Sequence, residues 1–147
     1  MAKKRILIID DLEIFREPIS IALQTAGFKT TTAENGKEAL KIVESNVQPF
    51  DLMIVDFSMP EMDGLEFVRR AACFGHKSLA PTLMLTDIAD KDVVIIAMKL
   101  GVKDYILKSN FSLTVLLEKV NKYVSSEVVA EEAAAPFAPP SDAVRIR

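Results

Sequence analysis

Short apolar runs alternate with segments of helical periodicity along most of this chain, and that alternation restricts the folds open to it. Five runs have the length of β-strands: residues 6–9, 28–33, 52–55, 81–86 and 103–107. Between them, apolar side chains recur at helical spacing, as at Phe15, Ile19 and Leu23. Strands that alternate with helices form a parallel sheet with helices on both faces. The sequence therefore predicts an α/β fold.

Capping residues mark the ends of several of the predicted helices. Asn35 and Ser112 precede two periodic segments and are typical N-caps. Gly27 and Gly101 follow two others and are typical C-caps, because glycine adopts the left-handed conformation that ends many helices. These positions agree with the strand boundaries, so the alternation of strand and helix is supported by local signals as well as by periodicity.

The composition changes near the end of the chain. Residues 1–126 contain all five strand-length runs, whereas residues 127–147 are rich in Ala, Glu and Pro. We predict one domain over 1–126, followed by a helical extension to about residue 135 and a Pro/Ala-rich linker or tail. A linker of this kind leaves open that the chain is the front of a longer protein with an output domain.

Bulk composition excludes several classes of protein. The net charge is −3, which argues against direct nucleic-acid binding because a duplex binder needs a basic surface. A single cysteine excludes a disulfide framework within the chain. The apolar run 6–9 is too short for a signal peptide, and no stretch approaches the length of a membrane span. We expect a cytoplasmic protein with no membrane partner.

Polar residues stand at the ends of four of the strand-length runs: Asp10, Asp11, Asp56, Thr86 and Lys108. Because parallel strands end at one edge of a sheet, these side chains should converge on one cleft. Three close carboxylates repel one another, whereas Mg²⁺ binds carboxylate and carbonyl oxygens and often shares a phosphate. The remaining hydroxyl and ammonium groups suit phosphoryl oxygens. The set predicts a magnesium and phosphate site.

Asp56 is the best placed of the three carboxylates. It ends the wholly apolar run 52–55 and precedes the loop signals Met59-Pro60 and Asp63-Gly64. A carboxylate at the end of a buried strand is partly desolvated, so its charge needs a cation nearby. Carboxylates are known nucleophiles that form aspartyl phosphates, and we predict this role for Asp56.

In this ordered set of residues the chain resembles the receiver domain of bacterial response regulators. The resemblance covers roughly residues 3–126 and rests on the order and intervals of Asp10-Asp11, Asp56, Met59-Pro60, Asp63-Gly64, Thr86, Gly101, Asp104-Tyr105 and Lys108. It implies a doubly wound (βα)5, flavodoxin-like domain with parallel strands in the order 2-1-3-4-5. It also implies a phosphorelay signalling domain that catalyses at most its own phosphorylation and dephosphorylation.

The resemblance further implies which acidic residue accepts the phosphoryl group and which residues bind Mg²⁺. Asp56 would accept a phosphoryl group from a sensor histidine kinase or a phosphotransfer protein. Mg²⁺ would be ligated by Asp11, Asp56 and the backbone carbonyl of Ser58, with Asp10 acting through water.

By the same resemblance, Lys108 and Thr86 would hold the phosphoryl oxygens and Tyr105 would be the switch aromatic. Added negative charge would draw Thr86 towards the phosphoryl group and open space for Tyr105 to turn inward. The face formed by the fourth helix, fifth strand and fifth helix would change with it. Residues 93–100 leave little polar surface on the fourth helix, which favours a partner, a homodimer or cover by the C-terminal extension.

Two residues depart from the family pattern. Ser109 follows Lys108, where the family usually has a proline, and Asp87 follows Thr86, where it usually has a small residue. The Asp87 carboxylate would repel incoming phosphate and slow phosphorylation. These departures leave open a pseudo-receiver that binds proteins independently of phosphorylation. A Mg²⁺-dependent phosphatase is a further alternative, although such enzymes usually carry an aspartate where this chain has Ser58.

Overall fold

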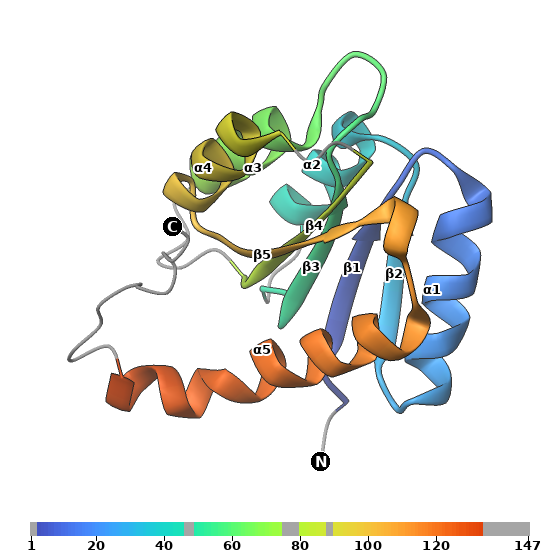
Figure 1. Ribbon diagram of the computed structural model, residues 1–147, viewed down its shortest axis with the longest axis vertical. Coiled ribbons are helices and arrows are strands. Elements are labelled where there is room, and N and C mark those ends of the chain that lie inside the picture. The colour runs from blue at the N-terminus through green and yellow to red at the C-terminus, as the bar shows by residue number, and fades with distance from the viewer. Residues whose placement is uncertain (1–2, 46–48, 75–79, 88–89, 134–147) are drawn as a thin grey trace.

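The computed structural model describes residues 3–45, 49–74, 80–87 and 90–133, with side chains up to residue 124 (Figure 1). Its elements, in chain order, are β1 (Arg5–Ile9), α1 (Glu13–Thr25), β2 (Lys29–Ala33), α2 (Gly36–Ser45), β3 (Leu52–Asp56), α3 (Gly64–Ala72), β4 (Thr82–Thr86), α4 (Lys91–Lys99), β5 (Val102–Leu107), the short 3-10 helix η1 (Lys108–Asn110) and α5 (Leu113–Ala133). Strand and helix alternate as the sequence predicts.

The strands form one parallel sheet in the order β2-β1-β3-β4-β5, which confirms the predicted doubly wound fold. In the register, Ile9 pairs with Val55 between β1 and β3, and Asp56 pairs with Leu85 between β3 and β4. Every strand pair runs parallel, so the carboxyl ends all lie at the same edge of the sheet. The threonine-rich strand β2 lies at the opposite side of the sheet from β5, as an edge strand.

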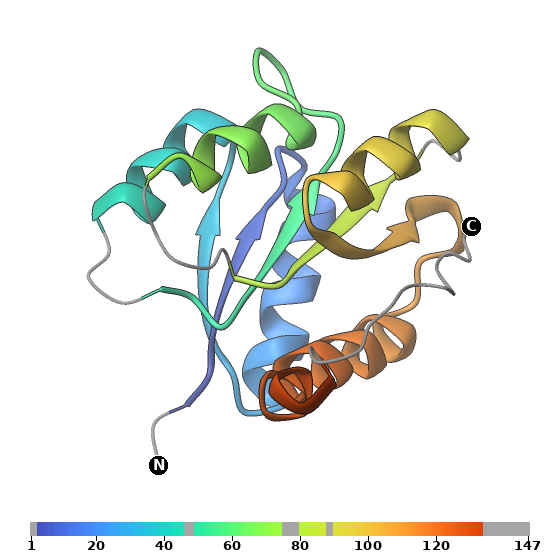
Figure 2. The same cartoon turned by 90° about the vertical axis from the view of Figure 1, so that its left-hand side faces the viewer.

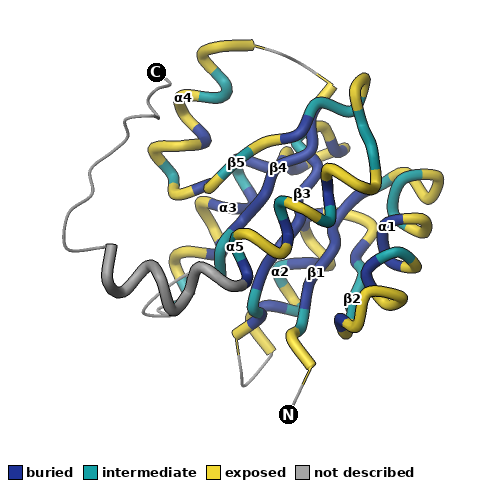
Figure 3. Tube along the Cα trace, turned by 60° about the horizontal axis from the view of Figure 1, so that its bottom comes forward, coloured by how far each residue is buried: buried dark blue, intermediate teal, exposed yellow. Residues whose placement is uncertain are grey.

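Helices cover both faces of the sheet, with α2, α3 and α4 on one face and α1 and α5 on the other (Figures 1 and 2). Side chains alternate along each strand, so each face has its own hydrophobic core. On β3, Met53 and Val55 pack under α2 and α3, whereas Leu52 and Ile54 pack under α1 and α5. The strands at the centre of the sheet are buried on both faces (Figure 3), which explains why they read as continuous apolar runs.

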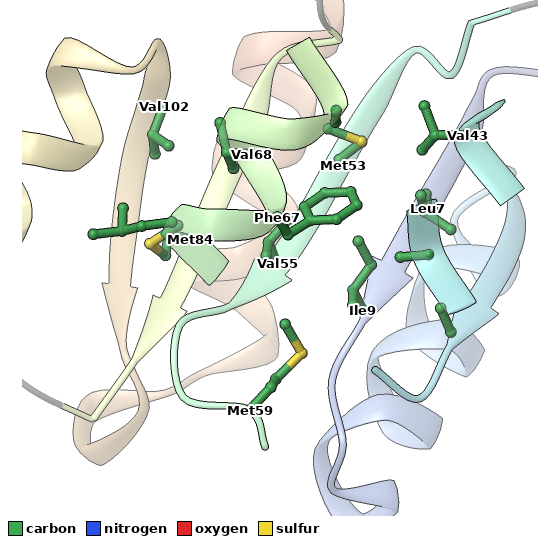
Figure 4. Packing of buried hydrophobic residues seen from close by; sticks show 14 of the residues in the cluster. Leu7, Ile9, Val43, Met53, Val55, Met59, Phe67, Val68, Met84 and Val102 are labelled. Atoms are coloured by element: carbon green, nitrogen blue, oxygen red, sulfur yellow. The ribbon is translucent and has the colours of Figure 1, made fainter. Parts of the chain in front are cut away.

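Phe67 is the largest fully buried side chain of the core beneath α2, α3 and α4. It lies fully buried among Met53, Val55 and Ile9, with Met59 from the loop after β3 closing the carboxyl-terminal end (Figure 4). This packing holds β3 and the loop that follows it against α3. The end of β3 is therefore held by the packing of the core.

The predicted caps are present. The side chains of Asn35 and Ser112 each accept a hydrogen bond from the backbone N–H three residues later, at 2.7 and 3.3 Å. Gly27 and Gly101 have φ values of +101° and +103°, a region that other residues rarely occupy. These local interactions end α1 and α4 and begin α2 and α5 where the sequence indicates.

Helix α5 continues past the core of the domain to Ala133 (Figure 1). The predicted domain boundary at residue 126 falls inside this helix and stays a prediction. The predicted linker or tail lies almost entirely in residues 134–147, which are outside the described residues. Among the helices in the described part of the chain, none is both long enough and apolar enough to cross a membrane.

Candidate functional site

The carboxyl ends of β1, β3 and β5 bring Asp10, Asp56 and Lys108 into direct contact. The Nζ atom of Lys108 lies 3.2 Å from Oδ2 of Asp10 and 3.1 Å from Oδ1 of Asp56. Asp10 and Asp56 are buried, at 0% and 2% exposed, and the Lys108 side chain is 10% exposed. Residues from both halves of the chain thus form one cluster of buried charges, as the strand-end argument predicts.

Three hydrogen bonds hold Asp10 in place. Its N–H donates to the carbonyl of Ala33 at 3.2 Å, and its Oδ1 accepts from the N–H of Leu12 at 2.9 Å. The guanidinium of Arg16 donates to the Asp10 carbonyl at 2.8 Å. These bonds fix the turn from β1 into α1 and leave Oδ2 directed to Lys108.

Asp56 owes its position to the close approach of α3. A Cβ atom on Gly64 would lie 2.6 Å from the carbonyl oxygen of Asp56 and 3.0 Å from Cα of Phe57, so glycine alone permits this packing. The N–H of Gly64 donates to the Phe57 carbonyl at 2.8 Å. Asp63 caps α3 by accepting from the N–H of Glu66 at 2.9 Å. The Asp63-Gly64 pair therefore anchors the loop that leaves Asp56.

Three carboxylates gather at this edge of the sheet. Asp10, Asp11 and Asp56 each offer an oxygen, and these oxygens all lie within 4.8 Å of one another. Oδ1 of Asp11 and Oδ2 of Asp56 are buried and accept no hydrogen bond from the described residues. One ammonium cannot balance three carboxylates, and an oxygen-only donor set is what hard divalent cations bind. The cluster can hold a metal ion.

Burial and the neighbouring charge of Asp10 raise the pKa of Asp56 from 3.8 to about 7, against the lowering effect of the Lys108 ammonium. Without a further cation, the Asp56 carboxylate is therefore partly protonated near neutral pH. A divalent cation bound beside it would favour the ionised form, because an opposite charge stabilises a carboxylate. Metal binding and ionisation of Asp56 are linked.

The other predicted site residues lie around this cluster. Thr86 is buried at the end of β4, where it pairs with Leu107, the residue before Lys108. Tyr105 on β5 pairs with Met84, so Tyr105 and Thr86 project from the same face of the sheet. Tyr105 is 36% exposed. Ser58 is exposed in the loop between β3 and α3.

Sequence reasoning missed the aromatic residues beside Lys108. Helical periodicity places Phe15 on an apolar stripe of α1, but its ring lies beneath the Lys108 ammonium, with Nζ 4.3 Å from the ring centroid. Phe111 packs edge-on against Phe15, at 5.9 Å between centroids and 81° between planes. No local pattern signals these contacts, because they join α1 to the segment that follows β5.

A known protein family matches the part of the chain that contains this cluster of charged residues. The family profile described as "Response regulator receiver domain" matches residues 6–121, which include all five strands from Ile6 onward and every residue of the cluster. This chain belongs to the response regulator receiver domain family. Receiver domains are signalling domains of two-component systems, so the predicted family is confirmed.

This receiver domain is similar in sequence to curated proteins of different lengths. It is 35% identical to the chemotaxis protein CheY of Pseudomonas aeruginosa over 119 residues, which cover 80% of this chain and 94% of CheY. It is 34% identical to the regulatory protein AtoC of Escherichia coli over 107 residues, covering 73% of this chain but only 22% of AtoC. The chain thus corresponds to nearly the whole of one relative and to a minor part of the other.

Solved structures share the fold of this receiver domain. Vibrio cholerae CheY4 superposes with a TM-score of 0.76 at 30% identity, over 83% of this chain and 99% of CheY4. A response regulator protein from Burkholderia pseudomallei superposes with a TM-score of 0.71 at 28% identity, over 94% of this chain and 78% of that one. The Burkholderia structure contains a phosphorylated aspartic acid, a calcium ion and citrate.

The two departures from the family pattern leave the cluster of this receiver domain intact. The described chain contains no cis peptide bond, so Lys108 and Ser109 are joined in trans, and the Lys108 side chain still reaches both aspartates. Asp87 is exposed immediately after Thr86. The negative side chain of Asp87 is therefore in contact with solvent, and it repels anions that approach this position from the solvent.

Proposed function

We propose that this receiver domain accepts a phosphoryl group on Asp56 in a Mg²⁺-dependent reaction, with a sensor histidine kinase or a phosphotransfer protein as donor. The surroundings of Asp56 are the main support for this proposal. Its carboxylate is 2% exposed, has one oxygen 3.1 Å from Lys108 and has the other buried with no hydrogen-bond donor among the described residues. A buried carboxylate with one oxygen left unpartnered is suited to form a new bond or to bind a metal.

The metal-binding part of the proposal uses Asp10, Asp11, Asp56 and the backbone carbonyl of Ser58. Two observations support it. One oxygen of each carboxylate lies within 4.8 Å of the others, and Oδ1 of Asp11 and Oδ2 of Asp56 accept no hydrogen bond within the described part of the chain. When bound, Mg²⁺ supplies positive charge that offsets the phosphoryl oxygens during transfer. Mg²⁺ suits the site because it needs few protein ligands and keeps several waters.

The covalent step uses Asp56 as nucleophile. A carboxylate oxygen of Asp56 forms a bond to phosphorus, and the bond between phosphorus and the donor atom breaks, with the electron pair leaving on the donor. Lys108 exchanges its contact with Asp56 for a phosphoryl oxygen, and Thr86 donates its hydroxyl to another phosphoryl oxygen. The phosphorylated aspartic acid of the 28% identical Burkholderia structure supports this chemistry by analogy.

The output part of the proposal rests on the face formed by α4, β5 and α5. Thr86 and Tyr105 project from the same face of neighbouring strands, so a shift of Thr86 changes the space open to Tyr105. On α4, Ile95, Ile96 and Met98 are exposed, which is unusual for a helix that has no partner. We propose that phosphorylation alters this face and favours a homodimer or another protein partner there, with no direct contact to nucleic acid.

Labelling by a small phosphodonor tests the proposal. Acetyl phosphate with Mg²⁺ should label the wild-type protein, whereas Asp56→Asn should abolish labelling and the exposed control Asp92→Asn should keep it. Beryllofluoride, a phosphoryl mimic, should bind the wild type only when Mg²⁺ is present. Undiminished labelling of Asp56→Asn would remove Asp56 as the acceptor. A wild type that neither labels nor binds beryllofluoride would be a pseudo-receiver, and steady turnover of a phosphate ester would favour the phosphatase alternative.

A further inference from the structure

Lys108 has an aromatic neighbour as well as two acidic ones. Its Nζ lies 3.2 Å from Asp10, 3.1 Å from Asp56 and 4.3 Å from the centroid of the Phe15 ring. A cation within about 6 Å of an aromatic centroid is attracted to the negative face of the ring. The ammonium thus has a third contact, and this one does not involve a titratable group.

The Phe15 ring is itself braced by the segment that carries Lys108. Phe111 meets it edge-on, which is a favourable geometry for an aromatic pair. Phe111 directly follows η1, which begins at Lys108, and its N–H donates to the Lys108 carbonyl at 3.2 Å. The Phe15 ring, which contacts the Lys108 side chain, is therefore packed against Phe111, which is hydrogen-bonded to the Lys108 backbone.

The Lys108 side chain needs contacts that fix its position. A lysine side chain is a flexible four-carbon stem, so a single productive position must be imposed by its surroundings. Ser109 follows Lys108, and serine does not restrict φ as a proline would. The two carboxylates cannot both hold the ammonium throughout the reaction, because Asp56 becomes covalently modified in the proposed step and only Asp10 is left.

We propose that Phe15 is a positioning residue for Lys108, with Phe111 as its support. An aromatic face attracts the ammonium but does not bind a phosphoryl oxygen, so it keeps Lys108 at the carboxyl edge of the sheet while the ammonium exchanges Asp56 for the phosphoryl group. Phe15 thereby speeds phosphorylation without touching the reacting atoms. The kinetic consequence rests on the proposed phosphoryl-acceptor function, whereas the position of Lys108 does not.

Two variants separate the ring's electrostatics from its packing. Phe15→Leu removes the aromatic face but keeps an apolar side chain, and pentafluorophenylalanine at position 15 keeps the ring shape while reversing its charge distribution. Both should slow labelling by acetyl phosphate and Mg²⁺ about 3- to 30-fold, the range expected for loss of a cation–π contact. Ile14→Leu is the matched control on the same turn of α1. Ile14 is 77% exposed, so this change should leave the rate unaltered.

Nuclear magnetic resonance supplies a readout that does not depend on phosphorylation. Protons on Cε of Lys108, next to Nζ, should be shifted upfield by the Phe15 ring in the wild type, and Phe15→Leu should abolish that shift. Unshifted Cε protons in the wild type would overturn the proposal, as would wild-type labelling rates in the fluorinated variant. If the wild type does not label at all, the phosphoryl-acceptor function fails, and the upfield shift alone then decides whether Phe15 positions Lys108.

Discussion

Lys108 Nζ lies 3.1 Å from Oδ1 of Asp56, although the two residues end strands that are not neighbours in the sheet. Strand β4 separates β3 from β5, so the lysine side chain reaches across the end of β4, where Thr86 is buried. This contact puts the Lys108 ammonium between two buried carboxylates and beside the proposed phosphoryl position. It therefore affects stability as well as chemistry.

Removing the ammonium should destabilise the domain in a way that depends on pH. We predict that Lys108→Ala lowers the free energy of unfolding by about 3 kcal/mol at pH 8, because two buried carboxylates lose their cation. The loss should be smaller at pH 5, where Asp56 can take up a proton instead. Urea unfolding in chelator measures both values, and Lys99→Ala, in the last turn of α4, is the control. Equal losses at the two pH values would contradict this account, and Mg²⁺ should restore part of the stability at pH 8.

The raised pKa of Asp56 predicts a second pH effect. Its pKa of about 7 in the folded protein lies above the unfolded value of 3.8, so the folded state binds the proton more tightly. Stability from this group is fully present below the unfolded pKa and is lost as pH rises through about 7. Asp56→Asn should therefore raise the free energy of unfolding by about 2 kcal/mol more at pH 8 than at pH 5 in metal-free buffer.

Urea titrations of Asp56→Asn and wild type at the two pH values measure this difference, with Asp92→Asn as an exposed control. Saturating Mg²⁺ should reduce the advantage of Asp56→Asn at pH 8, because a bound cation compensates the ionised carboxylate of the wild type. An identical difference between the two proteins at pH 5 and pH 8 would show that the Asp56 proton is not linked to folding.

Asp87 should slow phosphorylation by repelling the anionic donor. It is exposed directly after Thr86, so Asp87→Ala removes a negative charge at the end of β4, beside the proposed phosphoryl position. We predict that labelling by acetyl phosphate becomes roughly two- to fivefold faster at low ionic strength, and that added salt narrows the difference because it screens exposed charges. Asp92→Ala, on the first turn of α4, should have no such effect. Comparable rates for wild type and Asp87→Ala would defeat the hypothesis.

Gly64 should be intolerant of any side chain. A Cβ there meets backbone atoms of Asp56 and Phe57, which cannot move independently of β3, so Gly64→Ala should cost about 2 kcal/mol of stability and slow labelling of Asp56. Gly36→Ala is the matched control, because Gly36 also begins a helix, α2. The three atoms nearest its Cβ all belong to the flexible Met62 side chain, with Sδ at 2.8 Å, Cγ at 3.1 Å and Cβ at 3.3 Å, and none is backbone. Equal costs for both variants would show that the contact with β3 is unimportant.

Much of the site was predictable because its residues stand at strand ends. A run of apolar residues that stops at Asp56, or at Asp10, predicts a strand and the position of its carboxyl end. In a parallel sheet these carboxyl ends all lie at one edge. The same logic placed Thr86 and Lys108. It could not place Phe15, because the periodicity of α1 shows only that the side chain faces inward, without showing what it meets.

The sequence by itself determined the alternation of strands and helices, the caps at Asn35 and Gly101 and the polar residues at the strand ends. Each of these depends on periodicity or on neighbours along the chain. Only the tertiary structure decided that Lys108 reaches across β4 to Asp56, that Phe15 lies against the ammonium and that the pKa of Asp56 rises to about 7. Contacts of a few ångströms and the electric field at a buried group depend on side chains that come together only when the sheet and both helical layers have packed.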